Sequence, residues 1–93
     1  MPREIISKVK FERTYHCLSE ADQRLTDTAL KEFGHYLQTG SAPVGLGTKH
    51  LGSHTYEFRV SLALRVLYVL RDDQVILSLL GTHDEVRRFL KHQ

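Results

Sequence analysis

The chain has 93 residues, 41% of them hydrophobic, and a net charge of +2 from thirteen lysines and arginines against eleven acidic residues. This length fits one small domain over residues 1–93, and the apolar fraction excludes a disordered chain. The mild positive charge does not by itself indicate binding to nucleic acid.

The sequence also gives an expectation about the compartment. Its longest apolar runs are strand-sized, far short of a membrane span, and the opening residues MPREIISKVK lack the apolar core of a signal peptide. Cys17 is the only cysteine, so an internal disulfide is impossible. We therefore expect a cytoplasmic protein with no membrane partner.

The first half of the chain predicts one strand and one long helix. Apolar residues in REIISKVKFE (3–12) predict the strand, and the following ERTYHCL (12–18) reads as an added short helix or as the strand's exit. Ser19 suits an N-cap and Gly40 a stop, so a helix is predicted over about 19–39. The apolar positions at helical spacing are Ala21, Leu25, Ala29, Phe33, Tyr36 and Leu37.

The second half of the chain predicts a loop, three strands and a short helix. The glycine- and serine-rich stretch 40–53 predicts the loop, and the apolar stretches 54–61, 64–71 and 74–81 predict the strands. Residues 84–93 predict the helix, because acidic side chains stand at its start and basic ones near its end. The predicted fold class is α+β.

Two hairpins decide which side chains share a face of this sheet. A two-residue turn at 72–73 pairs Arg65 with Leu80. A three-residue loop between the first two strands pairs Arg59 with Arg65 and puts Glu57 on their face. A two-residue loop would instead bury Arg65 in an apolar layer, at a cost of several kcal/mol, so we expect the longer loop. The long helix is then expected to cover the opposite, apolar face, which bears Tyr56, Phe58, Val60, Leu64, Val66, Tyr68 and Leu70.

His83 follows the third strand in the sequence GTH. The ladder places it at the rim of the polar face, near the start of the strand that carries Arg65. We expect Gly81 to let the backbone bend sharply there. The loop that bears Lys49 and His50 can fold over the same surface.

From Lys49 to Leu90, the stretch KHLGSHTYEFRVSLALRVLYVLRDDQVILSLLGTHDEVRRFL resembles the RelE/ParE superfamily of bacterial toxins from toxin–antitoxin systems. The shared pattern is a Lys/His loop, an arginine-rich hairpin, an apolar strand and a Gly-x-His turn before a terminal helix. KH and GTH look most like the YafQ branch of RelE-type mRNA interferases. The resemblance implies a RelE-like domain: an antiparallel sheet of an N-terminal strand and a three-strand meander, packed by a helix or helical hairpin.

The same resemblance implies roles for individual residues. His83 stands where the YafQ branch has its catalytic histidine, and His50 stands where it has a loop histidine. Arg65 matches the hairpin arginine that stabilises the transition state in the YoeB branch, whose spacing Arg59 and Arg65 share. Glu57 matches an acidic strand position of the YafQ branch.

The chain also departs from both patterns. Arg59 replaces a second strand histidine of the YafQ branch, Ala63 replaces a hairpin aspartate, and Arg87 replaces an aromatic residue. The glutamate base of the YoeB branch has no counterpart in PVGLGTKH. The identity of the general base therefore stays open.

These side chains also suit RNA cleavage, in which the 2′-hydroxyl is the nucleophile. The reaction needs a base, an acid for the departing 5′-oxygen, and cations around the phosphorane. His50 is the expected base and His83 the acid, while Arg59 and Arg65 supply the cations, without a metal or other cofactor. The expected RNA-contacting residues are Lys49, His54, Arg87 and Arg88.

Three plainer readings stand beside this one. The histidines can be solvated loop residues, Arg65 can pair structurally with Glu57, and His50, His54 and His83 can form a zinc site. At the level of function, we expect a ribosome-dependent endoribonuclease toxin that is neutralised by a small antitoxin. The alternative is a non-catalytic ParE-like toxin that binds DNA gyrase, or a degenerate toxin that binds only its antitoxin.

Overall fold

The computed structural model describes residues 4–41 and 45–92. Parts of the predicted first strand, loop and last helix, namely residues 3, 42–44 and 93, lie outside the described residues. In chain order the elements are β1 (Glu4–Ser7), α1 (Val9–Cys17), α2 (Glu20–Thr39), β2 (Lys49–His50), β3 (Thr55–Arg59), β4 (Leu64–Arg71), β5 (Gln74–Thr82) and α3 (His83–Lys91).

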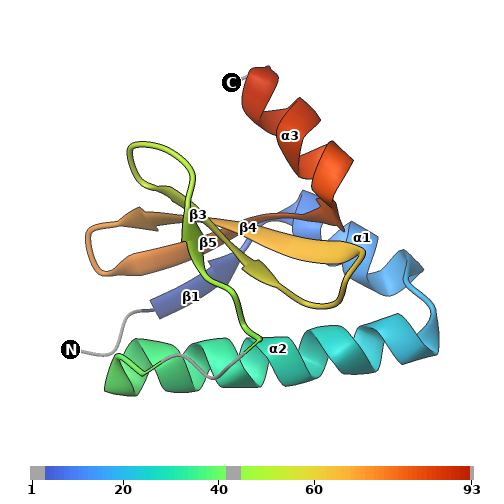
Figure 1. Cartoon of the computed structure of the whole chain (residues 1–93), viewed down its shortest axis with the longest axis horizontal. Helices are drawn as coiled ribbons and strands as arrows, with labels where there is room; N and C mark the ends of the chain where they lie inside the picture. Colours follow the sequence, from blue (N-terminus) through green and yellow to red (C-terminus); the bar gives the residue numbers. More distant parts are fainter. Residues whose placement is uncertain (1–3, 42–44, 93) are drawn as a thin grey trace.

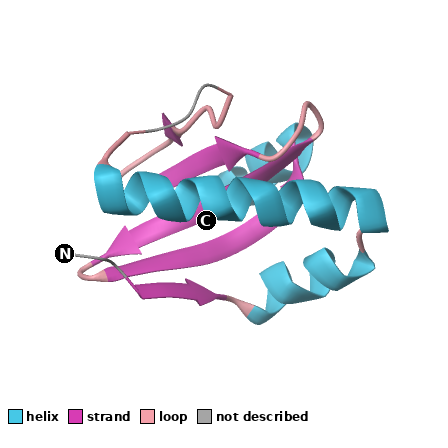
Figure 2. Cartoon of the chain, turned by 90° about the horizontal axis from the view of Figure 1, so that it is seen from below, coloured by secondary structure: helices cyan, strands magenta, loops and turns pink. Residues whose placement is uncertain are grey.

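The strands form one sheet in the order β1-β5-β4-β3-β2. The helices α2 and α3 lie on opposite sides of this sheet (Figure 1), and α2 runs across one whole face of it (Figure 2). The α+β class, the C-terminal three-strand meander and the short terminal helix are confirmed. We call the two sides of the sheet the α2 face and the α3 face.

The N-terminal strand is shorter than predicted, and its pairing makes the sheet mixed. β1 ends at Ser7, where the chain leaves the sheet and enters α1 at Val9, so the second half of the predicted strand is helical. Phe11, which belongs to α1, is buried in the core. The few apolar residues of this stretch fit the spacing of a strand as well as that of a helix, so packing decides between the two structures. β1 pairs parallel with β5, whereas the resemblance implied an antiparallel sheet.

The long helix begins and ends where its capping residues predict. Ser19 Oγ accepts a hydrogen bond from the Asp22 backbone N at 3.2 Å, and Gly40 closes the helix with φ of 76°. The predicted apolar stripe is wrong at its start, because Leu25 is 46% exposed and Thr26 is buried. The Thr26 hydroxyl donates to the backbone O of Asp22 at 2.8 Å, which satisfies it inside the core.

The β3–β4 register is the predicted one, with Arg59 opposite Arg65. The β4–β5 register starts as predicted but shifts by one residue at a bulge between Leu67 and Tyr68. Arg65 therefore pairs with Gly81, and the predicted partner Leu80 is wrong. Both faces of β5 are apolar, and the bulge decides that Leu80 is one of the residues that face α2.

Two apolar clusters result from this arrangement. The larger one joins the sheet to α2 and contains Phe11, Ala29, Phe33, Leu46, Phe58, Val66, Tyr68, Val75, Leu77 and Leu80. This confirms that the long helix covers the face of Phe58 and Val66. The smaller cluster lies under α3 and contains Leu67, Leu79 and Val86, with Leu51, Phe89 and Leu90 packed against them. The α3 face is therefore only partly polar.

Candidate functional site

Four charged side chains share the polar part of the α3 face. Lys49 pairs with Glu57 across β2 and β3, and Arg59 pairs with Arg65 across β3 and β4. Residues that pair directly lie on the same face, as do alternate residues of one strand. We call Lys49, Glu57, Arg59 and Arg65 the basic cluster.

The centre of the basic cluster is a buried ion pair. Arg65 Nη1 lies 3.7 Å from Glu57 Oε1, and the two side chains are 17% and 4% exposed. Arg65 Nε is buried without a hydrogen-bond partner among the described residues. The structural pairing that the sequence left as an alternative therefore exists, and it holds Arg65 in place within the sheet.

Arg59 lies exposed beside the loop that leads into β2. Its backbone N donates to the backbone O of Leu46 at 2.7 Å, and Leu46 is itself buried in the larger cluster. A Cβ atom at Gly47 would lie 3.8 Å from the Arg59 Cβ and 3.9 Å from its Nε, so the arginine packs against the loop backbone. The loop thus fixes the base of this side chain and leaves it open to solvent.

His83 is the first residue of α3 and is exposed. Helical spacing puts it in line with Val86 and Leu90, which pack against the α3 face of the sheet. Gly81, two residues before His83, pairs with Arg65. The junction between β5 and α3 therefore places His83 at the end of α3 that borders the basic cluster.

A capping box that the sequence pattern T-x-x-E could have revealed holds this turn. The Thr82 hydroxyl accepts from the Glu85 backbone N at 3.2 Å, and Glu85 Oε1 accepts from the Thr82 backbone N at 3.0 Å. The hydrogen bond from the Thr82 backbone, with that of the Thr82 side chain, lowers the pKa of Glu85. The carboxylate is thereby kept charged at the positive end of the helix.

Gly81 is favoured by a close approach and not by a bend. A Cβ atom there would lie 3.1 Å from the Glu85 Cβ and 3.3 Å from its Cδ. Gly81 is a paired residue of β5, and no positive φ occurs at this position. The expectation that Gly81 provides a sharp backbone bend is therefore wrong.

His50 lies on the α2 face, away from the basic cluster. It pairs with Tyr56, and the two rings stack with centroids 4.6 Å apart and planes 29° apart. Its Nε2 lies 3.3 Å from the backbone O of Ser53. The neighbouring Lys49, and not His50, therefore stands on the face of Glu57. The sequence reasoning missed this because it did not predict the short strand β2, which sets the alternation.

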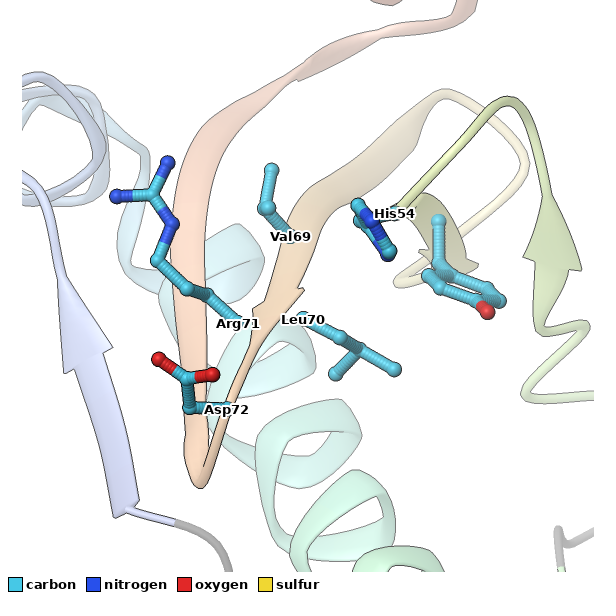
Figure 3. Close-up of a pocket in the computed structure, with 6 residues that line it drawn as sticks. His54, Val69, Leu70, Arg71 and Asp72 are labelled. Atoms are coloured by element: carbon cyan, nitrogen blue, oxygen red, sulfur yellow. The ribbon is translucent and has the colours of Figure 1, made fainter.

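His54, Arg87 and Arg88 are not among the residues that the strand pairing brings together in the basic cluster. Figure 3 shows His54 from the loop before β3 facing a hollow beside Val69, Leu70, Arg71 and Asp72 of the β4–β5 hairpin. This hollow, which Tyr56 also lines, has a volume of about 460 Å³. Arg87 and Arg88 are exposed on α3, and Arg88 borders a groove between α1 and α3 together with Lys10 and Phe89.

Within residues 4–41 and 45–92, no group of three or more His, Cys, Asp or Glu side chains could hold a metal ion. The zinc-site alternative from His50, His54 and His83 is therefore wrong. No helix in the described part of the chain is long and apolar enough to cross a membrane.

Solved structures share this fold. A copper-bound mutant toxin from Helicobacter pylori is 21% identical, with a TM-score of 0.65 over 90% of this chain and 98% of that one. A chain of the E. coli DinJ–YafQ complex is 17% identical, with a TM-score of 0.62 over 90% and 97%. The archaeal RelE–RelB complex from Pyrococcus horikoshii gives 16% identity and a TM-score of 0.66 over 88% and 96%. No protein-family model and no curated protein sequence matches the chain.

The fold implied by the sequence resemblance is thus confirmed: the chain has the RelE/ParE-type toxin fold, with YafQ- and RelE-like neighbours.

Proposed function

We propose that this chain is the toxin of a type II toxin–antitoxin system and cleaves messenger RNA on the ribosome, in the cytoplasm. The observation that carries the proposal is the basic cluster beside the His83 turn. It gathers three cations and one imidazole-bearing helix end on one side of the sheet. The toxin fold of the neighbouring structures supports the same reading.

The chemistry follows from the charges. The 2′-oxygen of the substrate attacks the adjacent phosphorus, and its proton leaves to solvent water as the phosphorane forms. Lys49 and Arg59, both exposed, contact the non-bridging oxygens, whose charge grows in the transition state. His83 donates a proton to the departing 5′-oxygen. One preorganised donor of this kind is worth roughly 10²–10³ in rate.

Arg65 and Glu57 have a supporting part in this mechanism. Arg65 lies at the centre of the basic cluster, and its pair with Glu57 fixes the guanidinium before substrate arrives. A fixed cation stabilises developing charge without reorganising during the reaction. The cleavage chemistry made His50 the expected base, but His50 lies on the other face of the sheet. In this proposal Lys49 instead stabilises the 2′-oxygen electrostatically while the proton passes to water.

The proposed partner is a small cognate antitoxin. Two of the structural neighbours are toxin–antitoxin complexes, DinJ–YafQ and RelB–RelE. The exposed Lys49 and Arg59 complement an acidic, amphipathic segment that folds on binding. Such a segment would neutralise the toxin by covering the cations that the phosphate needs.

One observation favours a second candidate, a non-catalytic toxin that binds DNA gyrase or only its antitoxin. Arg65 is largely buried, and its charge is paired with Glu57, so it offers less to a phosphate than an open arginine would.

Primer extension on a reporter messenger RNA after toxin induction separates the two candidates. Cuts confined to translated codons support the ribosome-dependent nuclease. Intact transcripts together with an SOS response would refute it and support a gyrase-binding toxin. Intact transcripts without an SOS response, in cells that the toxin leaves growing, would indicate a protein that binds only its antitoxin.

A further inference from the structure

The outer end of an aromatic stack lies at the β2 edge of the sheet. The His50 ring is exposed and lies against the Tyr56 ring, which in turn stacks on Tyr68 at 5.5 Å with planes 15° apart. Tyr68 is 3% exposed and belongs to the larger apolar cluster. The stack therefore anchors the exposed imidazole to the core, and the contact of its Nε2 with Ser53 further fixes the ring.

From this geometry we infer that His50 and Tyr56 form a stacking platform for a base of single-stranded RNA. The inference rests on the proposed function, because it assigns a nucleotide that neighbours the cleaved phosphate to the α2 face. Aromatic rings held flat at a surface bind bases of any sequence, since every base presents a π face. An imidazole serves this purpose through its ring, independently of its protons.

Tyr56 also borders two hollows that lie beyond the platform. One, of about 460 Å³, is lined by His54 and Arg71, and the other, of about 280 Å³, by Tyr36 and Tyr68. Arg71 also lines the first hollow, but it follows Leu70 on β4 and its side chain points to the side of the hairpin away from His54 (Figure 3). The cation that accompanies the stacked rings is therefore Lys49, the residue before His50 on β2, and aromatic rings together with a cation bind single strands without sequence readout.

The edge strand links the platform to the basic cluster. Lys49 and His50 are consecutive, so their Cα atoms are about 3.8 Å apart while their side chains point to opposite faces. One RNA strand that crosses this edge can place a phosphate on Lys49 and the adjoining base on His50. This continuity favours RNA over a protein segment as the occupant.

The test uses a short RNA that carries 2′-O-methyl groups, which prevent cleavage, and a 2-aminopurine whose fluorescence falls when it stacks. Toxin with His50→Phe keeps a flat ring and should retain the quenching. Toxin with His50→Ala should lose the quenching and bind this RNA roughly 5- to 100-fold more weakly. His35→Ala, which removes an exposed histidine from α2, is the matched control and should bind like the parent.

Each result decides the proposal. Unchanged quenching and affinity in His50→Ala would overturn it, and so would a loss in His50→Phe as large as in His50→Ala. If His50→Ala weakens binding of the antitoxin but not of RNA, the platform is a protein contact and the proposal fails. Circular dichroism checks the fold, and His50→Thr, which suits a strand and has no ring, replaces the alanine variant if that unfolds.

Failure of the proposed function is distinguishable from failure of this inference. Parental toxin that quenches 2-aminopurine through His50 but cuts no message on ribosomes keeps the platform and refutes the nuclease. Parental toxin that cuts messages but shows no His50-dependent quenching keeps the nuclease and refutes the platform.

Discussion

A Cβ atom at Gly81 would lie 3.1 Å from the Cβ of Glu85, four residues further along the chain. This contact joins the end of β5 to the first turn of α3, and His83 stands between the two residues. A side chain at position 81 therefore requires Glu85 to shift by a few tenths of an ångström.

We expect Gly81→Ala to lower the free energy of unfolding by about 1–3 kcal/mol, the usual cost of overpacking. Gly34→Ala is the matched control, because nothing lies within 4 Å of its added Cβ and the site is inside α2. That substitution should stabilise the chain by about 0.5–1 kcal/mol through helix propensity. Urea denaturation measures both, and equal effects of the two substitutions would contradict the close contact.

The lowered pKa of Glu85 predicts a pH-dependent contribution to stability. Its folded-state pKa lies below the ordinary 4.5 because of the hydrogen bonds from Thr82. The stabilisation is therefore present above about pH 4.5 and is lost as the pH falls through the folded-state value. Glu85→Gln keeps an acceptor for the Thr82 N–H but cannot ionise. Denaturation from pH 7 to pH 3 should show the parent losing its advantage over Glu85→Gln on acidification; a constant difference would argue against this linkage.

The buried pair of Glu57 and Arg65 predicts strong coupling between the two positions. Arg65→Ala leaves a carboxylate that is 4% exposed without its cation, which should cost about 3–5 kcal/mol. The double substitution Glu57→Leu with Arg65→Met should recover much of that loss, because it removes both charges. A double-mutant cycle in urea measures the coupling. Additive losses would show that the two side chains do not interact in solution.

The catalytic proposal predicts that two exposed positions separate activity from stability. His83→Ala and Arg59→Ala should each slow cleavage about 10²-fold or more. Both should leave the free energy of unfolding within about 0.5 kcal/mol, because both side chains are exposed. The double variant should be little slower than either, as for groups that act as a unit. Single-turnover cleavage on programmed ribosomes is the measurement, and parental rates in His83→Ala would end its proposed role.

The sequence predicted the face of Arg65 correctly because burial of an unpaired charge excludes the other register. The pairing predicted for the next strand, β5, was wrong beyond the bulge. Ser78 is buried and its hydroxyl donates to the Ile76 backbone O at 3.2 Å, so a polar residue sits at the bulge at little cost. A ladder counted from a turn contains no sign of such a shift, because the bulge arises from packing on both faces.

The sequence predicted which residues gather at the candidate site, but it placed one of them on the wrong face of the sheet. Glu57, Arg59 and Arg65 share a face as expected. His50 was expected beside them, yet a strand of only two residues, formed inside a glycine-rich loop, turns it to the other face. Strands this short carry no periodic signal, and pairing with β3 alone decides which neighbour faces which side.

The loop and strand before β3 also affect how this protein associates with itself. Along the outer edge of β3, Arg59 N is bonded to the backbone O of Leu46, and Thr55 O accepts from the backbone N of Leu51, with β2 paired between these contacts. Backbone groups bonded in this way cannot recruit a strand from another molecule. The protein's own chain therefore prevents another molecule from pairing directly with β3. The two edges left for an added strand are β1, which has four residues, and β2, which has only two.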